Sequence, residues 1–247
     1  MKKSASNYFV CLNMKSLHVI IMIFLIVGCS KSRTENKPRT VQNNKLIYGI
    51  DVSNHQGKID WKKVKTWNDN KIYFVYIKAT EGATYRDKMY DINIKGAKSN
   101  NILVGSYHYF RTTSSVQKQF ENFKNTVAKN KQDLIPLVDV EEMNEWNNEL
   151  FNENFKEFLN LVESHFGVKP MIYTVNSFYN KNLSKKYKSY KFMIGRYGEN
   201  VPFMKDKNEW FIWQFSESGN VKGINKKVDI NIINSKYNMS ELLLNKK

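Results

Sequence analysis

The sequence predicts an α/β fold, a single irregular (β/α) barrel similar to a TIM barrel, with about five β/α units closed by three further strands. From residue 48 onward, short runs rich in β-branched and aromatic residues alternate with amphipathic stretches, as in proteins with parallel sheets. The chain has 247 residues, of which 41% are hydrophobic, enough to bury one large core. Residues 46–247 show no internal repeat and no sign of a second domain.

Eight runs are expected to form the strands of this barrel. The early runs are nearly continuous in apolar residues, which is typical of strands covered on both faces. The last three follow at shorter intervals, which leaves less room for helices. The expected strands are residues 48–53, 73–79, 103–110, 134–140, 171–175, 191–197, 211–215 and 227–232.

Helices are expected between the first five strands, where the connections are long enough for a crossover. Residues 114–129 and 152–166 both place apolar side chains at helical spacing. Ser114 is the expected N-cap of the first of these helices, because its hydroxyl suits the free backbone N–H groups there. Gly167 is the expected end of the second helix.

The formal net charge of +16 favours an anionic partner. The lysines are spread along the whole chain, which favours a solvated basic surface over a nucleic-acid site, because nucleic-acid readers gather Lys and Arg on one face. The two cysteines, Cys11 and Cys29, precede the expected domain, so its fold does not depend on a disulfide. No Cys/His cluster has zinc spacing, and we expect no metal and no cofactor.

The N-terminal segment resembles a bacterial export signal. Residues 17–28 are apolar, about as long as a signal-peptide core, and the run ends at Cys29 as in a lipobox. We expect a lipoprotein signal peptide over residues 1–28, lipidation of Cys29, a flexible tether over 29–45 and the catalytic barrel over 46–247. The alternative is an uncleaved anchor helix in which Cys29 is incidental. Both interpretations bring the protein to a membrane and place its domain outside the cytoplasm.

Polar side chains at the C-terminal ends of barrel strands converge on one mouth, where the active site lies. Acids within apolar strands are costly to bury unless they are paired or functional. Asp139 and Glu141 are the sharpest signal, because residues two apart on a strand face the same side, whereas Val140 and Glu142 would point away. A proton donor beside an anion suits glycosidic bond cleavage. A divalent-cation site or a helix cap remains the alternative.

Seven segments occur in a fixed order along the chain. They are Gly49–Ser53 with Gln56-Gly57, Phe74–Gly82, Gly105–Phe110, Pro136–Glu141, Ile172–Thr174, Trp213–Phe215 and Val228–Asn231. Together they resemble the motifs of glycoside hydrolase family 25, the muramidases, over about residues 46 to 235. The sequence departs from the family where the sixth strand lacks a Trp and where Ile232 and Ile233 follow Asn231.

The resemblance implies a peptidoglycan hydrolase that cleaves the β-1,4 bond between N-acetylmuramic acid and N-acetylglucosamine without a metal. Glu141 would be the acid/base, and Asp139 would orient or charge-stabilise the acetamido group of the substrate. Asp51 and Asp229 would line the same catalytic site. The implied substrate-binding residues are Tyr76, Lys78, Glu81, Tyr107, Tyr109, Tyr173, Arg196, Tyr197, Trp213 and Gln214.

Each of these residues also has a structural explanation. The aromatic side chains suit a barrel core as well as a sugar platform, and Lys78 and Glu81 suit a structural ion pair. His108 is expected to be a hydrogen-bonded structural residue, because no Ser or Cys nucleophile motif accompanies it. Two other functions stay open: a catalytically impaired peptidoglycan-binding barrel, and a nucleic-acid-binding or metal-dependent phosphoesterase domain. We expect a monomer that acts on peptidoglycan strands.

Overall fold

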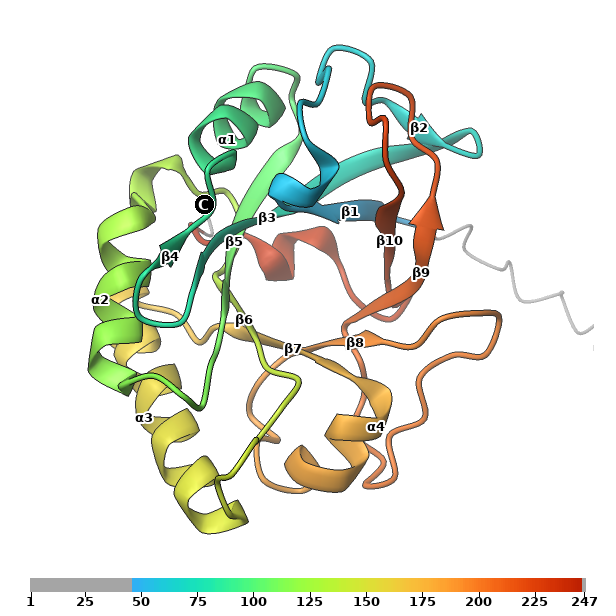
Figure 1. Cartoon of the computed structure of the whole chain (residues 1–247). Helices are drawn as coiled ribbons and strands as arrows, with labels where there is room; N and C mark the ends of the chain where they lie inside the picture. The colour runs from blue at the N-terminus through green and yellow to red at the C-terminus, as the bar shows by residue number, and fades with distance from the viewer. Residues whose placement is uncertain (1–45, 246–247) are drawn as a thin grey trace, which may run out of the picture. The chain divides into compact units, whose positions relative to one another are not determined.

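The computed structural model describes residues 46–245, which fold around a closed barrel of eight strands (Figure 1). The barrel closes because the first strand pairs both with the second barrel strand and with the last. Around the barrel the order is β1-β10-β9-β8-β7-β6-β5-β3. The strands are β1 (Tyr48–Val52), β3 (Asn70–Glu81), β5 (Leu103–Tyr109), β6 (Leu137–Asp139), β7 (Met171–Val175), β8 (Phe192–Gly195), β9 (Ile212–Gly219) and β10 (Val228–Ile233).

Two short strands, β2 (Thr66–Trp67) and β4 (Tyr85–Arg86), extend the sheet by pairing with β3. The turn from β2 to β3 consists of Asn68 and Asp69, which both have positive φ values of 43° and 62°. Two such residues form the tight turn whose twist matches a β-hairpin, and Asn and Asp tolerate this backbone best after glycine.

Most α-helices among residues 46–245 lie along one side of the barrel, the short one that follows β7 lies apart from them, and the side formed by β2, β9 and β10 carries none (Figure 1). The α-helices are α1 (Tyr90–Lys98), α2 (Val116–Thr126), α3 (Asn148–Phe166) and the single turn α4 (Asn176–Phe178), which continues into the π-helix η3 (Tyr179–Leu183). The 3-10 turns are η1 (Asn54–Gln56), η2 (Lys129–Lys131) and η4 (Met239–Leu242).

The expectation of about five regular β/α units is therefore only partly met. In the described chain, the connection from β1 to β3 holds η1 and β2 in place of an α-helix, and the connection after β7 holds one α-turn and η3. Strand β10 runs antiparallel to both of its neighbours, because residues 220–227 are too short for the crossover that a parallel strand needs. The fold is a closed eight-stranded barrel with few helices, rather than a regular TIM-like barrel.

The ends of several elements differ from the sequence predictions. The predicted N-cap Ser114 is wrong: the cap of α2 is Ser115, and its side chain makes no capping bond. Strand β6 begins three residues later than expected, after Pro136, which has no N–H to donate to a neighbouring strand. The predicted stop at Gly167 is confirmed, since this residue ends α3 with a φ of 74°.

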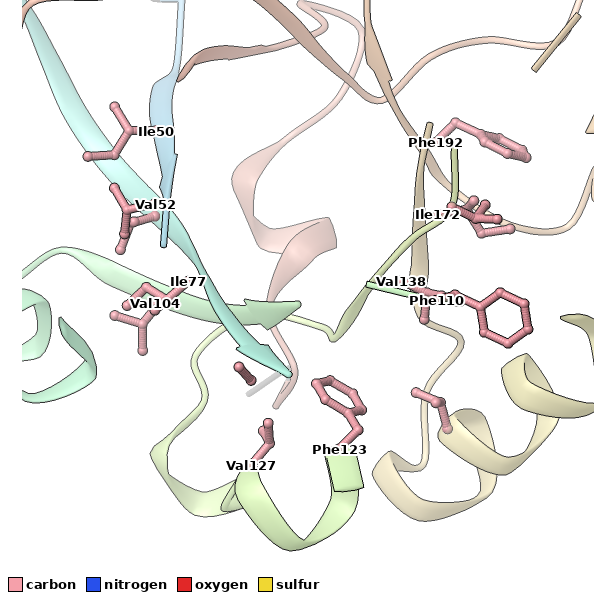
Figure 2. Packing of buried hydrophobic residues seen from close by; sticks show 14 of the residues in the cluster. Ile50, Val52, Ile77, Val104, Phe110, Phe123, Val127, Val138, Ile172 and Phe192 are labelled. Carbon is pink, nitrogen blue, oxygen red and sulfur yellow. The ribbon is translucent and has the colours of Figure 1, made fainter. Parts of the chain in front are cut away.

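The barrel separates two hydrophobic layers. The outer layer lies between the strands and the helices, and Figure 2 shows Phe123 of α2 and Val127, which directly follows α2, together with Ile77, Val104 and other strand residues of this layer. The inner layer fills the barrel itself with large side chains from alternate positions. Its fully or nearly fully buried members are Phe74, Tyr76, Leu134, Ile135, Leu137, Met171, Tyr173, Met193, Phe211, Ile212, Ile233 and Leu242.

The C-terminal segment seals the end of the barrel at which the parallel strands begin. Leu242 of η4 is fully buried in the inner layer, and its carbonyl accepts a 2.8 Å hydrogen bond from the backbone of Ile135, just before β6. Leu134 forms an isolated bridge with Leu243. Only the opposite end, where the parallel strands finish, is therefore open to form a site.

The expected signal peptide over residues 1–28, the lipidated Cys29 and the tether over 29–45 lie outside the described residues. Within residues 46–245, none of the helices is both long enough and apolar enough to cross a membrane.

Candidate active site

A pocket of about 220 Å³ opens at the C-terminal ends of the parallel strands. Side chains from all eight barrel strands, or from the residues directly after them, reach it, so segments far apart in sequence meet there. Its walls are formed by Asp51, Ser53, His55, Lys78, Tyr107, Tyr109, Leu137, Asp139, Glu141, Tyr173, Met193, Tyr197, Gln214 and Asp229.

Asp139 and Glu141 lie together in this pocket, at and just after the end of β6. Asp139 is only 7% exposed, and its Oδ1 has no hydrogen-bond partner among the described residues. Burial, followed by the charge of Glu141, holds the pKa of Asp139 well above its usual range. Burial also raises the pKa of Glu141. The pair therefore favours retention of a proton, as an acid catalyst requires.

The residues that alternate with this pair lie elsewhere. Val140 is fully buried in the outer layer, behind the pocket. Glu142 forms an ion pair with Arg111 and does not line the pocket. The alternation of side chains at the end of β6 thus directs Asp139 and Glu141 into the pocket and Val140 and Glu142 away from it, as strand geometry requires.

Asp51 and Asp229 form a second carboxylate pair, directly opposite each other on the antiparallel strands β1 and β10. Oδ2 of Asp51 accepts hydrogen bonds of 2.9 Å from Gln214 Nε2 and from Asn231 Nδ2. Burial raises the pKa of Asp229 to about 9, and the charge of Asp51 and a hydrogen bond with it add to the shift. Burial raises the pKa of Asp51 as well, although the hydrogen bonds from Asn231 and Gln214 oppose this shift. Asp229 consequently holds the proton of this pair, and the two amide donors favour the anion on Asp51.

Gln214 is held in one orientation by two tyrosines. Its Oε1 accepts hydrogen bonds from the hydroxyl of Tyr173 at 2.7 Å and from that of Tyr197 at 3.2 Å. This leaves its N–H₂ group directed at Asp51. Gly195 makes the arrangement possible, because a Cβ at this position would lie 2.6 Å from the Tyr173 hydroxyl oxygen.

A cationic cluster stands at the edge of the pocket. Lys78 Nζ lies 2.5 Å from Glu81 Oε2, and Arg111 Nη2 lies 2.6 Å from Glu81 Oε1. Both cations also face the ring of Tyr109, at 5.2 Å for Lys78 Nζ and 4.4 Å for the Arg111 guanidinium carbon. Lys78 and Tyr109 line the pocket, whereas Glu81 does not and instead links the two cations. The ring of Tyr109 is thereby fixed against the wall.

Three of the other sequence-predicted binding residues lie outside the pocket lining. Tyr76 is fully buried within the barrel, where its hydroxyl donates to the carbonyl of Ile135 at 3.2 Å. The guanidinium of Arg196 donates to the carbonyl of Val201 at 2.9 Å. Trp213 is on the opposite face of β9 from the pocket, and its indole N–H donates to the Arg196 carbonyl at 2.6 Å.

Four lining residues were missing from the predicted set: Ser53, His55, Leu137 and Met193. Ser53 and His55 follow Asp51 within four residues, so their nearness to the strand end was a usable signal. Leu137 and Met193 are apolar and give no chemical signal in a sequence. Asn231 was seen as a polar strand residue, and its position two after Asp229 places it on the same face of β10.

His108 faces the outer layer and is fully buried. Its Nδ1 lies 2.7 Å from Thr80 Oγ1, and its Nε2 lies 3.2 Å from Gln119 Oε1, which accepts. Burial lowers the pKa of His108 to about 3, so the ring is neutral. The structure thus shows the hydrogen-bonded histidine that the sequence suggested. No group of three or more His, Cys, Asp or Glu residues between 46 and 245 is arranged to hold a metal ion.

Comparison with known proteins agrees with this geometry. The Escherichia coli (strain K12) protein YegX is 36% identical over 190 residues, which cover 76% of this chain and 70% of YegX. An autolytic lysozyme of Clostridium acetobutylicum is 32% identical over 74% of this chain and 54% of its own length. A family 25 glycosyl hydrolase structure from Bacillus anthracis superimposes with a TM-score of 0.72 at 29% identity, covering 81% of this chain and 93% of that one.

The model of the glycosyl hydrolases family 25 matches residues 50–224, which include Asp51 of β1, the Asp139 and Glu141 pair and the strand that carries Gln214. This range spans most of the described barrel. The chain therefore belongs to glycosyl hydrolase family 25 and is a glycoside hydrolase.

Proposed function

We propose that this enzyme is a muramidase, a lysozyme that hydrolyses the β-1,4 bond between N-acetylmuramic acid and N-acetylglucosamine in peptidoglycan. The observation that carries the proposal is the meeting of Asp139 and Glu141 in one pocket at the strand ends of a family 25 barrel. The autolytic lysozyme among its relatives supports peptidoglycan as the substrate. Action on peptidoglycan places the enzyme outside the cytoplasm.

Glu141 acts as the proton donor in this proposal. It is less buried than Asp139 and stands at the pocket edge, where the oxygen between two sugars would pass. Its raised pKa keeps a proton available, and the departing sugar oxygen needs this proton as the bond breaks. After departure, the Glu141 carboxylate accepts a proton from the incoming water, so that the starting state is restored.

Asp139 orients the reacting sugar. Its free Oδ1 has no partner within residues 46–245 and can accept the N–H of the substrate's 2-acetamido group. That hydrogen bond favours the anion on Asp139, so the proton shared by the pair settles on Glu141 when substrate binds. The acetamido oxygen is then positioned to assist at the anomeric carbon. Asp51, whose anion accepts hydrogen bonds from Gln214 and Asn231 while Asp229 holds the proton of the pair, balances the positive charge that develops there.

We further propose that residues 1–28 are a lipoprotein signal peptide, that lipid on Cys29 anchors the enzyme, and that it works as a monomer on the tether 29–45. The support is the apolar run that ends in Ile26-Val27-Gly28-Cys29. A tether of this length lets the barrel reach wall glycan while it stays at the membrane surface.

Mass spectrometry of products from purified peptidoglycan tests the activity. Muramidase action releases fragments with N-acetylmuramic acid at the new reducing end. Fragments with N-acetylglucosamine at that end would show that the other glycosidic bond is cut. Wall binding without any released fragment would instead identify a catalytically impaired peptidoglycan-binding barrel.

A further inference from the structure

Glu141 lies on a loop between β6 and α3 that forms no helix or strand. Residues that follow β5 hold this loop on both sides of Glu141. The backbone N–H of Phe110 donates to the carbonyl of Asp139 at 2.8 Å, and the hydroxyl of Thr112 accepts a 2.8 Å hydrogen bond from Nδ2 of Asn144. The position of Glu141 therefore depends on contacts with the segment after β5.

Arg111 makes the charged contact of this junction. Its Nη1 forms an ion pair with Glu142, the residue next to Glu141. Its Nε and Nη2 donate to Oε1 of Glu81 at 2.8 Å and 2.6 Å, and its guanidinium carbon lies 4.4 Å from the centre of the Tyr109 ring. The guanidinium thus connects the loop after β6 to the ends of β3 and β5.

The charges around Glu141 come from several elements. Burial raises the pKa of Glu141, the charge of Glu142 adds to this rise, and the charge of Arg111 opposes it. The two members of one ion pair therefore act on the proton of Glu141 in opposite directions. The titratable and charged groups around Glu141 are the acids Asp51, Asp139 and Glu142, the cations Lys78, Arg111 and Lys181, and the tyrosines Tyr109 and Tyr173.

We propose that Arg111 is a positioning residue for the proton donor, because it fixes the loop that carries Glu141 and offsets the negative charge around it. This inference rests on the role of Glu141 in the proposed muramidase function. Arg111 does not line the catalytic pocket, so it acts on the reaction through Glu141. The planar guanidinium suits this task, since its fork of N–H groups can hold two carboxylates at once, whereas an ammonium is a single point of charge.

The first test removes each member of the ion pair in turn and compares the pH dependence of kcat/KM on soluble peptidoglycan oligosaccharides. Arg111→Gln removes a cation, so Glu141 should keep its proton to higher pH, and the basic limb should move up by about half a pH unit. Glu142→Gln removes an anion, so the same limb should move down by about as much. An ion pair with a merely structural role predicts no such opposition, because both variants break the same contact.

The second test separates position from charge. Asn144→Ala breaks a contact of the same loop without changing any charge, so kcat should fall while the basic limb stays in place. Arg111→Lys keeps the charge but not the fork, so the limb should stay near its wild-type position while kcat falls about ten-fold. Lys98→Gln breaks the 2.7 Å ion pair with Asp133 before the start of β5, at the opposite end of the barrel, and should change neither.

Shifts of Arg111→Gln and Glu142→Gln in the same direction, or no shift in either, would overturn the role of Arg111 alone. Glu142 is partly exposed, so its variant should fold even if Arg111→Gln does not. Titration of the ¹³C-labelled Glu141 carboxyl by NMR makes the same comparison without turnover. A wild-type enzyme inactive on peptidoglycan would overturn the muramidase function, and this titration would still show whether Arg111 and Glu142 oppose each other at Glu141.

Discussion

Gln214 donates a hydrogen bond from Nε2 to Oδ2 of Asp51 at 2.9 Å, although the two residues are 163 positions apart in the chain. The contact crosses the barrel mouth and is fixed from behind by the hydroxyls of Tyr173 and Tyr197. It supplies one of the two amide donors that favour the charged form of Asp51. Through Gln214, the hydroxyls of Tyr173 and Tyr197 are thus linked to the charge of Asp51.

Replacing Gln214 with Leu should raise the pKa of Asp51, because an anion that loses a hydrogen-bond donor is less stable. Since activity requires charged Asp51, the acidic limb of the kcat/KM profile should move to higher pH. The measurement is the pH dependence of wall hydrolysis. Gln117→Leu on the exposed face of α2 serves as control. An acidic limb that stays in place would contradict the role given to Asp51.

Glu141→Gln should lower the rate by roughly two to four orders of magnitude, as is typical when acid catalysis is removed. The amide keeps the shape of the side chain but cannot donate and regain a proton. Turbidity loss of cell walls measures the rate, and a pull-down on insoluble peptidoglycan checks that binding persists. Glu153→Gln, exposed on α3, should keep full activity. Near-normal turnover by Glu141→Gln would show that another group donates the proton.

Asp229→Asn should increase stability at neutral pH while it damages activity. The folded-state pKa of Asp229 is about 9, against an ordinary value of 3.8. Below about pH 4, Asp229 carries its proton in both the folded and the unfolded protein. As pH rises from there toward 9, only the unfolded protein releases this proton, so the free energy of unfolding falls.

The amide side chain of the variant has no proton to release, so its free energy of unfolding does not fall in this way as pH rises. We expect it to be more stable than wild type by roughly 1 to 3 kcal/mol at pH 7 and by much less near pH 3.5. Denaturant unfolding of both proteins at the two pH values measures the difference. A stability difference that does not change with pH would mean that Asp229 is charged in the folded protein.

His108 should remain neutral across the working range of the enzyme, because burial lowers its pKa to about 3. The ring resonances of this histidine in NMR spectra should therefore not shift between about pH 5 and pH 8. Between its unfolded value of 6.5 and about 3, the unfolded state gains a proton that the folded state refuses, so His108 makes the protein less stable as pH falls. A titration of His108 near pH 6.5 would contradict its structural role.

Cys29→Ala should release the enzyme from the membrane fraction, because the lipid that anchors it has no other attachment point in the proposed lipobox. The measurement is fractionation of cells that produce either form, with the Cys11→Ala variant as control. Continued membrane attachment of an uncleaved Cys29→Ala protein would indicate an anchor helix in place of a lipid.

The sequence was sufficient to predict the strands and the residues at their ends. Apolar runs identified all eight barrel strands, and alternation at the end of β6 placed Asp139 and Glu141 on one side. These features depend on neighbours in the chain, so local pattern reveals them. The Asn68-Asp69 turn was equally local, and its two turn-forming residues were a signal that could have predicted the hairpin.

Features set by contacts across the barrel could not be predicted in this way. Trp213 and Gln214 are adjacent in sequence, yet only Gln214 lines the pocket. The pairing of β9 with β10 determines which face of β9 turns toward the pocket. Tyr76 lies on an inner face like Tyr107 but sits deeper in the barrel, where it cannot reach the mouth. The distance of a side chain from the barrel mouth depends on how neighbouring strands are staggered, and the sequence of a single strand does not show this stagger.

The pairing of β1 with β10 also sets when during synthesis the enzyme becomes active. Asp51 and Asp229 meet only after the last strand has been added, and Leu242 seals the barrel later still. A nascent chain, or one being threaded across a membrane, thus lacks both a complete carboxylate set and a closed core. Long-range closure of this kind is slow compared with local folding. The topology itself therefore delays wall-cutting activity until β10 and the segment around Leu242 have emerged.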